Sequence, residues 1–171
     1  MGRPLKRRGF LLVLCLMLTL LLFVLGLSFL GKRATQYRRT NHAALAAQAK
    51  ALAEAGMEDA LLKFQRDLSF PPISTDQASF SYAEEMTDGG VRVGSYTVTI
   101  SGTYREEPYL VLLVTAVGEA GDDPAMPSAR RAMVAEVDIS KLERIDTDSD
   151  GIFDPNPYYR RVINFNDLGA P

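Results

Sequence analysis

One uninterrupted apolar run near the start of the chain is its strongest hydrophobic signal. Residues 10–31 contain no charge and no proline, and only Thr19 and Ser28 are polar. At a helical rise of about 1.5 Å per residue, a run of this length reaches roughly 30 Å, which is the thickness of the hydrocarbon core of a bilayer. A core helix of a soluble protein would carry a polar face along one side. The pattern therefore predicts a transmembrane helix over residues 10–31.

A helical pattern continues beyond the apolar run. The segment from Thr40 to Leu68 is rich in alanine, leucine, glutamate, lysine and glutamine, which all favour helix. Its large apolar residues mark one face of a helix, at Leu45, Leu52, Leu61, Phe64 and Leu68. We therefore predict that residues 32–70 form an amphipathic continuation of the membrane helix, which Pro71 and Pro72 end.

After Pro72 the spacing of apolar residues changes to the pattern typical of strands. The expected strands are a short one at Ser79–Tyr82, alternating ones at Val91–Ile100 and Arg131–Ile139, and a nearly continuous apolar one at Tyr109–Val117. The expected turns are residues 89–90, 106–108 and 118–127, which contain glycine or proline. From Lys141 onward the chain is predicted to be mostly loop, with Tyr159–Phe165 as a candidate edge strand.

The order of these elements defines the expected fold. Three longer strands in meander order predict a small antiparallel sheet with one face packed on the second half of the helix. The fold class is therefore α+β, with one long amino-terminal helix followed by a β-rich globular domain over residues 71–171. Outside the first 31 residues roughly 140 remain, which suffices for one domain.

The residues before the apolar run add a second signal. A short basic leader contains Arg3, Lys6, Arg7 and Arg8, and Gly9 and Phe10 follow it at once. A basic leader, a glycine, a phenylalanine and an immediate apolar helix resemble the signal of type IV prepilins. The resemblance implies that a prepilin peptidase cuts after Gly9 on the cytoplasmic side of the membrane. Residues 1–9 would then be a leader peptide, and Phe10 would be the N-methylated mature terminus.

Two other processing routes stay open. A basic leader and an apolar run also occur in signal anchors that are never cleaved. The other route is a secretory signal peptide, because Gly26-Leu27-Ser28 has the small-x-small pattern of a cleavage site. In that case the product would begin at Phe29.

The second half of the expected helix strengthens the resemblance. Residues 49–64, AKALAEAGMEDALLKF, resemble the helix of PilX-type minor pilins. A helix half in the membrane and half packed on a small antiparallel sheet is the type IV pilin architecture. The resemblance implies a minor pilin or pseudopilin, a structural subunit in the assembly, initiation or tip of a type IV pilus or a type II secretion pseudopilus. Its implied partners are other pilin-like subunits, the inner membrane and the prepilin peptidase.

Leu14 marks a departure from the pilin pattern. Pilins usually carry glutamate at the fifth mature position, which is Leu14 when the chain starts at Phe10. The resemblance, with this difference, implies a tip or initiation subunit of low copy number and not the major repeating subunit.

Charge narrows the location and the partners. The 171-residue chain has a formal net charge of −2, which argues against nucleic acid as a partner. Basic residues flank both ends of the apolar run in equal number, so the positive-inside rule gives no orientation. The leader and the size of the C-terminal domain predict a single-pass protein of the bacterial inner membrane with an extracytoplasmic domain.

Cys15, the only cysteine, lies within the apolar run, so no disulfide can form inside the chain.

One acidic segment contains candidate metal ligands. Aspartates occupy the first, third, fifth and ninth positions of an EF-hand-like calcium loop, at Asp146, Asp148, Asp150 and Asp154, with glycine at the sixth. Ile152 would add its backbone carbonyl as a ligand. Pro157 stands where an EF-hand has its bidentate glutamate, so the loop is more similar to the acidic repeats of thrombospondin type 3.

The acidic segment leaves two interpretations open. One is a calcium site, and the other is a solvated acidic turn that holds no metal. Calcium binding suggests an alternative function, that of an uncleaved, membrane-anchored calcium-binding module of the cell envelope. The sequence contains no P-loop, nucleophile elbow or zinc-binding spacing, and we therefore expect no enzyme.

Overall fold

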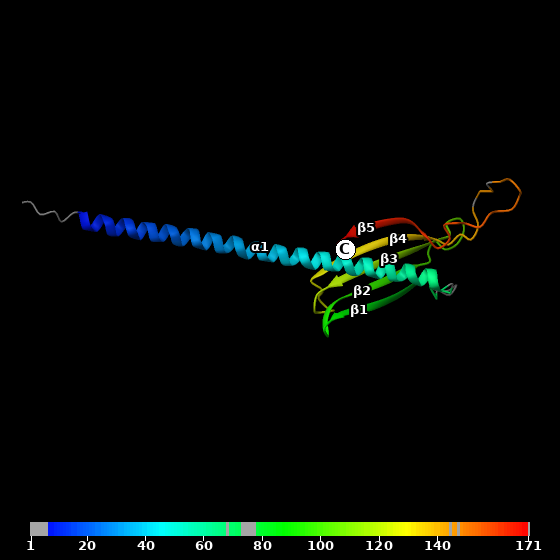
Figure 1. The fold of residues 1–171 in the computed structure, drawn as a ribbon, viewed down its shortest axis with the longest axis horizontal. Coiled ribbons are helices and arrows are strands. Elements are labelled where there is room, and N and C mark those ends of the chain that lie inside the picture. Colours follow the sequence, from blue (N-terminus) through cyan, green and yellow to red (C-terminus); the bar gives the residue numbers. More distant parts are fainter. Residues whose placement is uncertain (1–6, 68, 73–77, 144, 147, 171) are drawn as a thin grey trace, which may run out of the picture. The chain divides into compact units, whose positions relative to one another are not determined.

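The computed structural model describes residues 7–67, 69–72, 78–143, 145–146 and 148–170. Its elements are α1 (Arg7–Arg66), β1 (Ser79–Asp88), β2 (Val91–Ser101), β3 (Val111–Ala120), β4 (Ala129–Asp138) and β5 (Val162–Gly169) (Figure 1). The chain divides into two compact units, Met1–Ala43 and Ala44–Pro171, so that α1 contributes to both. One long helix and an antiparallel sheet confirm the expected α+β class.

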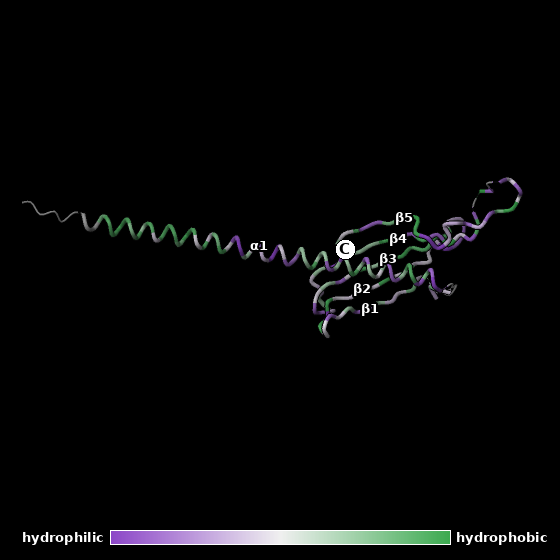
Figure 2. Tube along the Cα trace, viewed as in Figure 1, coloured by the Kyte–Doolittle hydropathy of each residue, from purple (hydrophilic) through white to green (hydrophobic). Residues whose placement is uncertain are grey.

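In the first unit, α1 presents an apolar surface. The large apolar side chains from Phe10 to Leu30 are each more than half exposed, and Figure 2 shows this part of the helix as a continuous hydrophobic stretch. The helix is long and apolar enough to span a membrane. Its polar residue Thr19 donates its hydroxyl hydrogen to the carbonyl oxygen of Leu16 at 2.9 Å, so the hydroxyl is satisfied within the helix. Exposed apolar surface of this extent favours contact with lipid or protein over water.

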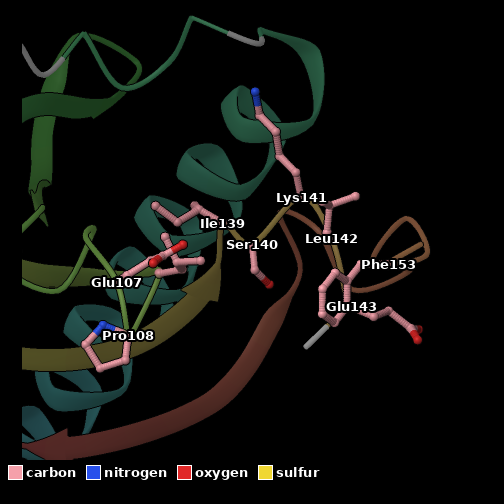
Figure 3. Close-up of a pocket in the computed structure, with 9 residues that line it drawn as sticks. Glu107, Pro108, Ile139, Ser140, Lys141, Leu142, Glu143 and Phe153 are labelled. Carbon is pink, nitrogen blue, oxygen red and sulfur yellow. The ribbon is translucent and has the colours of Figure 1, made fainter. Parts of the chain in front are cut away.

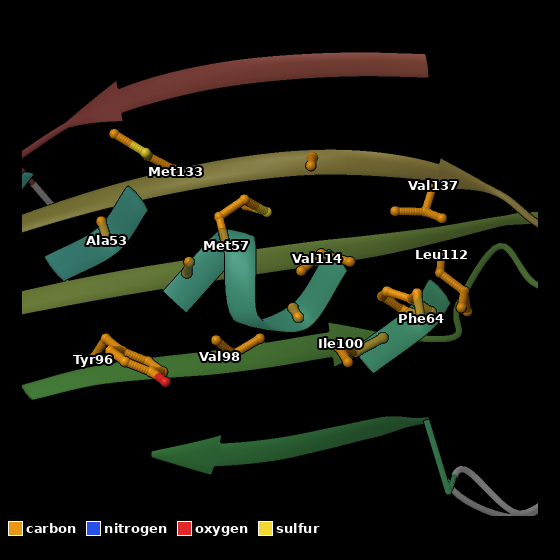
Figure 4. Close-up of a cluster of buried hydrophobic side chains, with 13 residues drawn as sticks. Ala53, Met57, Phe64, Tyr96, Val98, Ile100, Leu112, Val114, Met133 and Val137 are labelled. Carbon is orange, nitrogen blue, oxygen red and sulfur yellow. The ribbon is translucent and has the colours of Figure 1, made fainter. Parts of the chain in front are cut away.

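In the second unit, α1 packs on one face of the sheet. Its buried residues recur every three or four positions, as one face of a helix requires, at Ala49, Ala53, Met57, Ala60 and Phe64. The sheet contributes alternate buried residues of its three central strands, among them Val98, Val114 and Val137 (Figure 4). Leu52 is also buried, and Leu45 and Leu61 are partly buried, which confirms the predicted apolar face. Leu68 and the leader residues 1–6 lie outside the described residues.

Small residues bring the helix backbone close to the sheet. A Cβ atom placed on Gly118 of β3 would overlap the carbonyl oxygen of Ala49 and the amide nitrogen of Ala53. Both partner atoms belong to the backbone of α1, so neither can turn aside as a side chain would. The close approach of the two backbones therefore requires glycine at position 118.

The five strands form one antiparallel meander. Their order in the sheet is β1-β2-β3-β4-β5, so β1 and β5 are the edges. Val98 of β2 lies opposite Ala116 of β3, which in turn lies opposite Met133 of β4. Because facing residues share one side of the sheet, this register gathers the buried side chains under α1.

The structure corrects several predicted strand bounds. β1 continues to Asp88 and not only to Tyr82, because its acidic residues lie exposed on an edge strand, where they need no core. β3 runs through Gly118 to Ala120, so the start of the expected turn at 118–127 is strand. The candidate edge strand at Tyr159–Phe165 is β5, shifted to Val162–Gly169.

The helix also ends earlier than predicted, at Arg66 and not at residue 70. The carboxylate of Asp67 accepts the amide hydrogen of Ser69 at 2.8 Å and the hydroxyl hydrogen of Ser69 at 2.6 Å. Such a local side-chain contact offers the backbone an alternative to another helical turn. The helix therefore ends before the two prolines are reached.

The close approach at Gly118 leads to a stability prediction. We expect Gly118→Ala to lower the free energy of unfolding by about 1–3 kcal/mol, because the added methyl group forces the two backbones apart. Thermal and denaturant unfolding of the full chain in mild detergent measure this change. Gly102→Ala is the matched control, since there the nearest atom belongs to the flexible side chain of Arg105. Equal destabilisation by both substitutions would contradict the assigned role of Gly118.

Candidate functional site

The connection between β4 and β5 carries the acidic segment. Figure 1 shows it as a long loop beyond one end of the sheet. At its base Leu142 and Pro155 form an isolated β-bridge. The amide of Glu143 donates to the carbonyl oxygen of Asp154 at 2.8 Å, and the amide of Asn156 donates to that of Lys141 at 3.0 Å. These contacts close a neck, and the aspartate-rich tip projects from it.

Asn156 fastens this neck to the end of β4. Its side-chain amide lies 2.9 Å from Oδ2 of Asp138, 2.9 Å from the carbonyl oxygen of Ser140 and 2.7 Å from Oγ of Ser140. Ser140 is buried and also donates its own amide hydrogen to Asp138 at 2.8 Å. The sequence pattern does not predict this group of contacts. Its only signal is a position between two prolines, which predicts a turn but names no partner.

Three aspartates meet at the tip of the loop. One carboxylate oxygen from each of Asp146, Asp148 and Asp150 lies within 4.8 Å of the others. The carboxylate of Asp146 also accepts amide hydrogens from Ser149 at 2.7 Å and from Gly151 at 2.8 Å. These bonds, the one from Gly151 foremost, lower the pKa of Asp146 below its usual value. The carboxylate of Asp146 is therefore held in its charged form at neutral pH, with the carboxylates of Asp148 and Asp150 close beside it.

Gly151 has the role that its place in the pattern predicts. Its φ angle is +85°, which lies in the left-handed region, where glycine avoids the strain of a side chain. Ser149 takes a similar φ of +60°, and the amide hydrogen of Ser149 goes to Asp146. The loop therefore curls so that alternate carboxylates converge, as the spacing predicts.

The other two predicted ligands lie differently. Asp154 is not part of the group of three carboxylates, and its carbonyl oxygen belongs to the neck. Ile152 donates its amide hydrogen to Oδ1 of Asp150 at 2.7 Å, and its side chain is exposed. Hard oxygen ligands suit calcium, but three carboxylates alone leave most of its coordination positions to water or to backbone oxygens.

The predicted processing residues lie within α1. The helix begins at Arg7, so Gly9 and Phe10 are both helical. The side chain of Phe10 is 70% exposed and that of Leu14 is 52% exposed. Leu14 therefore presents an exposed apolar side chain at the position where the resemblance implies a carboxylate.

A polar cluster between α1 and the strands β1 and β2 is likewise not predicted by the sequence pattern. The hydroxyl of Tyr82 donates to Asp59 at 2.8 Å, and the ammonium of Lys63 lies 2.5 Å from the same carboxylate and 3.9 Å from the centre of the Tyr82 ring. The hydroxyl of Tyr96 donates to Glu84 at 2.8 Å. Burial, and next the hydrogen bond to the carboxylate, raise the pKa of each phenol. Both phenols therefore stay neutral and serve as donors. Tyr82 of β1 joins the sheet to Asp59 of α1, whereas Tyr96 of β2 joins Glu84 of β1 within the sheet.

Comparisons with models of protein families, with curated protein sequences and with solved structures find no match for this chain. Inferences about its function therefore rest on its residues and on their geometry.

We propose calcium as the cation that the tip of the loop would bind. A cation that binds only the folded loop adds about 2.7 kcal/mol of stability at a hundredfold excess over its dissociation constant. The full chain in mild detergent should therefore unfold at a higher temperature in calcium than in chelator. We expect Asp148→Ala to remove most of this difference.

The control for this prediction is Asp122→Ala, which removes an exposed aspartate from the turn between β3 and β4. It should leave the calcium effect unchanged. Identical unfolding temperatures of the parent chain in calcium and in chelator would show that the segment is a solvated acidic turn.

Proposed function

We propose that the chain is a minor pilin or pseudopilin, a structural subunit in the assembly, initiation or tip of a type IV pilus or a type II secretion pseudopilus. One observation carries the proposal. α1 is a single helix that contains the exposed apolar stretch and also the buried face that covers an antiparallel sheet. One element thus provides a surface suited to a membrane or to a bundle of apolar stems, and a surface that holds a folded domain.

In this proposal the apolar stretch lies in the bacterial inner membrane and the domain from Ala44 onward lies outside the cytoplasm. Residues 10–31 contain no charged side chain that would oppose this placement. Other pilin-like subunits would contact the same stretch after extraction from the membrane. Contact between apolar stems would replace contact with lipid, so the surface stays out of water in both states.

Leu14 defines the place of the subunit within the proposed assembly. A mature amino terminus at Phe10 is an ammonium group, which is costly in apolar surroundings unless a carboxylate pairs with it. In pilins with glutamate at the fifth position, an incoming subunit is expected to offer that carboxylate to the subunit already in place. This chain offers leucine there, yet its own ammonium can still receive a carboxylate. A subunit whose ammonium can receive a carboxylate, but which offers no carboxylate to another subunit, fits the first position of a filament.

The acidic loop favours a second candidate function. The convergence of Asp146, Asp148 and Asp150 also suits an anchored calcium-binding module whose leader is never cut. The two functions differ in one covalent event, the cleavage after Gly9. Calcium binding by itself does not separate them, because a pilin subunit can carry the same loop.

The first prediction of this proposal is cleavage. We expect mass spectrometry of the protein from its own host to find Phe10 as an N-methylated terminus. The physical requirement is that the peptidase reaches the peptide bond at the membrane surface, where the basic leader meets the apolar stretch. Gly9→Val is the control and should leave the leader attached. An intact leader in the parent protein would favour the signal anchor, and a start at Phe29 would favour a secretory signal peptide.

The second prediction concerns position in the filament. We expect deletion of the chain to reduce the number of filaments, or the secretion that they support, without changing the helical symmetry of those that form. Immunogold labelling should find the protein at filament tips. Leu14→Glu should admit it to the shaft and raise its copy number, because the new carboxylate can pair with the ammonium of the preceding subunit.

Leu18→Glu is the matched control for this prediction. It adds a carboxylate one helical turn further along, away from the fifth position, and should not admit the subunit to the shaft. Gold particles spread evenly along the shaft by the parent protein would contradict a tip position. An unchanged location and copy number of Leu14→Glu would show that the missing carboxylate does not set the place of the subunit.

A further inference from the structure

An apolar groove lies at the same end of the sheet as the acidic loop. It has a volume of about 670 Å³, within the range of sites that hold a ligand or a few side chains. One wall comes from the β2–β3 connection and the other from the β4–β5 connection, at and near its neck. They include Pro108, Leu110, Ile139, Leu142 and Phe153 (Figure 3).

Large apolar side chains of this groove are exposed to solvent. Leu142 is 53% exposed and Phe153 is 50% exposed. Outside the lining of the groove, in the same β2–β3 connection, Tyr104 and Tyr109 pack edge to face with 5.5 Å between ring centres, and each is also about half exposed. Apolar side chains that gather in this way at a surface are typical of a site that binds a partner.

The backbone of the groove is held in a strained form. Leu110 has a φ of +52°, in the left-handed region that bulky residues rarely adopt. Its amide donates to the carbonyl oxygen of Glu106 at 3.3 Å, and its own carbonyl oxygen accepts the amide hydrogen of Ile139 at 2.9 Å. The second bond joins the two walls of the groove. Strain that the surrounding structure maintains in this way is concentrated at binding sites in proteins.

Acidic side chains flank the apolar floor. Glu107 comes from one connection and Glu143 from the other, and Figure 3 shows them on opposite sides of the groove. Neither carboxylate forms a salt bridge within the part of the chain that the structure describes. Lys141 also lines the groove, but its ammonium points away from both carboxylates (Figure 3). The groove therefore offers an apolar centre between two negative charges.

We propose that this groove binds an extended peptide segment of another protein, apolar at its centre and carrying lysine or arginine on both flanks. The apolar centre would cover Leu142 and Phe153, and the basic flanks would meet Glu107 and Glu143. Anionic partners such as a phospholipid surface or a nucleic acid are disfavoured by the two glutamates. The proposal stands on the groove alone and does not depend on a role as a pilin.

The test uses the full chain in nanodiscs of phosphatidylcholine and a fluorescent heptapeptide with lysine at both ends and leucines between. Two matched peptides replace the lysines by glutamates or the leucines by serines. Empty nanodiscs measure the direct binding of each peptide to lipid. We expect saturable binding above this background for the lysine–leucine peptide, at least about tenfold tighter than for the other two.

Substitutions locate the binding to the groove. Leu142→Ala should weaken it about tenfold, while Leu168→Ala, which truncates a 61% exposed leucine on β5, should not. The double substitution Glu107→Lys and Glu143→Lys should weaken the lysine peptide and strengthen the glutamate peptide. Glu58→Lys on the exposed face of α1 is the charge control.

Hydrogen exchange of the parent chain gives a readout that needs no variant. The lysine–leucine peptide should protect amides in residues 104–111 and 139–143 more than amides of β1. Equal binding of the lysine and glutamate peptides, or unchanged binding after both groove substitutions, would overturn the proposal. Protection confined to other residues would also overturn it. So would dimerisation of the chain that the same substitutions abolish, because the occupant would then be a second copy.

Discussion

The close approach of α1 to the sheet is the constraint on which the folded domain depends. Cys15 is the only cysteine, so packing and polar contacts hold the second unit together without a disulfide. Where Ala49 and Ala53 meet Gly118, the two backbones are almost in contact. Further along, Met57 and Phe64 fill the wider space between helix and sheet. Protein interiors are close-packed, so this graded set of side-chain sizes fixes the height and the direction of the helix above the strands.

Polar contacts then secure the helix along its length. Gln48 donates to the carbonyl oxygen of Val93 at 3.0 Å, and Asp59 accepts from Tyr82 at 2.8 Å. At the end of the helix, Arg160 donates to the carbonyl oxygens of Phe64 at 2.8 Å and Asp67 at 2.7 Å. The last carbonyls of a helix lack partners within it, so Arg160 supplies donors that the helix cannot.

Local periodicity predicted most of the fold, because both the helix and the central strands bury one regular face. It placed the helix, the meander and the edge strand. The spacing of the aspartates, a separate signal, predicted the convergence of Asp146, Asp148 and Asp150 but wrongly included Asp154. Local periodicity placed the end of the helix too late, because the contact between Asp67 and Ser69 ends the helix at Arg66, ahead of the two prolines. It also missed Asn156 and Tyr82, whose partners lie 18 and 23 residues away in sequence. Such pairs leave no local pattern, so only the folded chain reveals them.

The β4–β5 connection has an anchored base and a tip that, among the described residues, makes hydrogen bonds within the loop. The base is held by contacts to other elements, from Asn156 to β4 and from Arg160 to α1. At the tip, the hydrogen bonds of the three aspartates come from amides of the loop itself. A cation at the tip would therefore order backbone that has few other constraints. A peptide in the groove would instead meet walls that are already fixed, because Leu110 and Ile139 join them. Preformed walls lower the entropic cost of binding, so the proposed binding of a peptide in the groove would not require calcium at the tip.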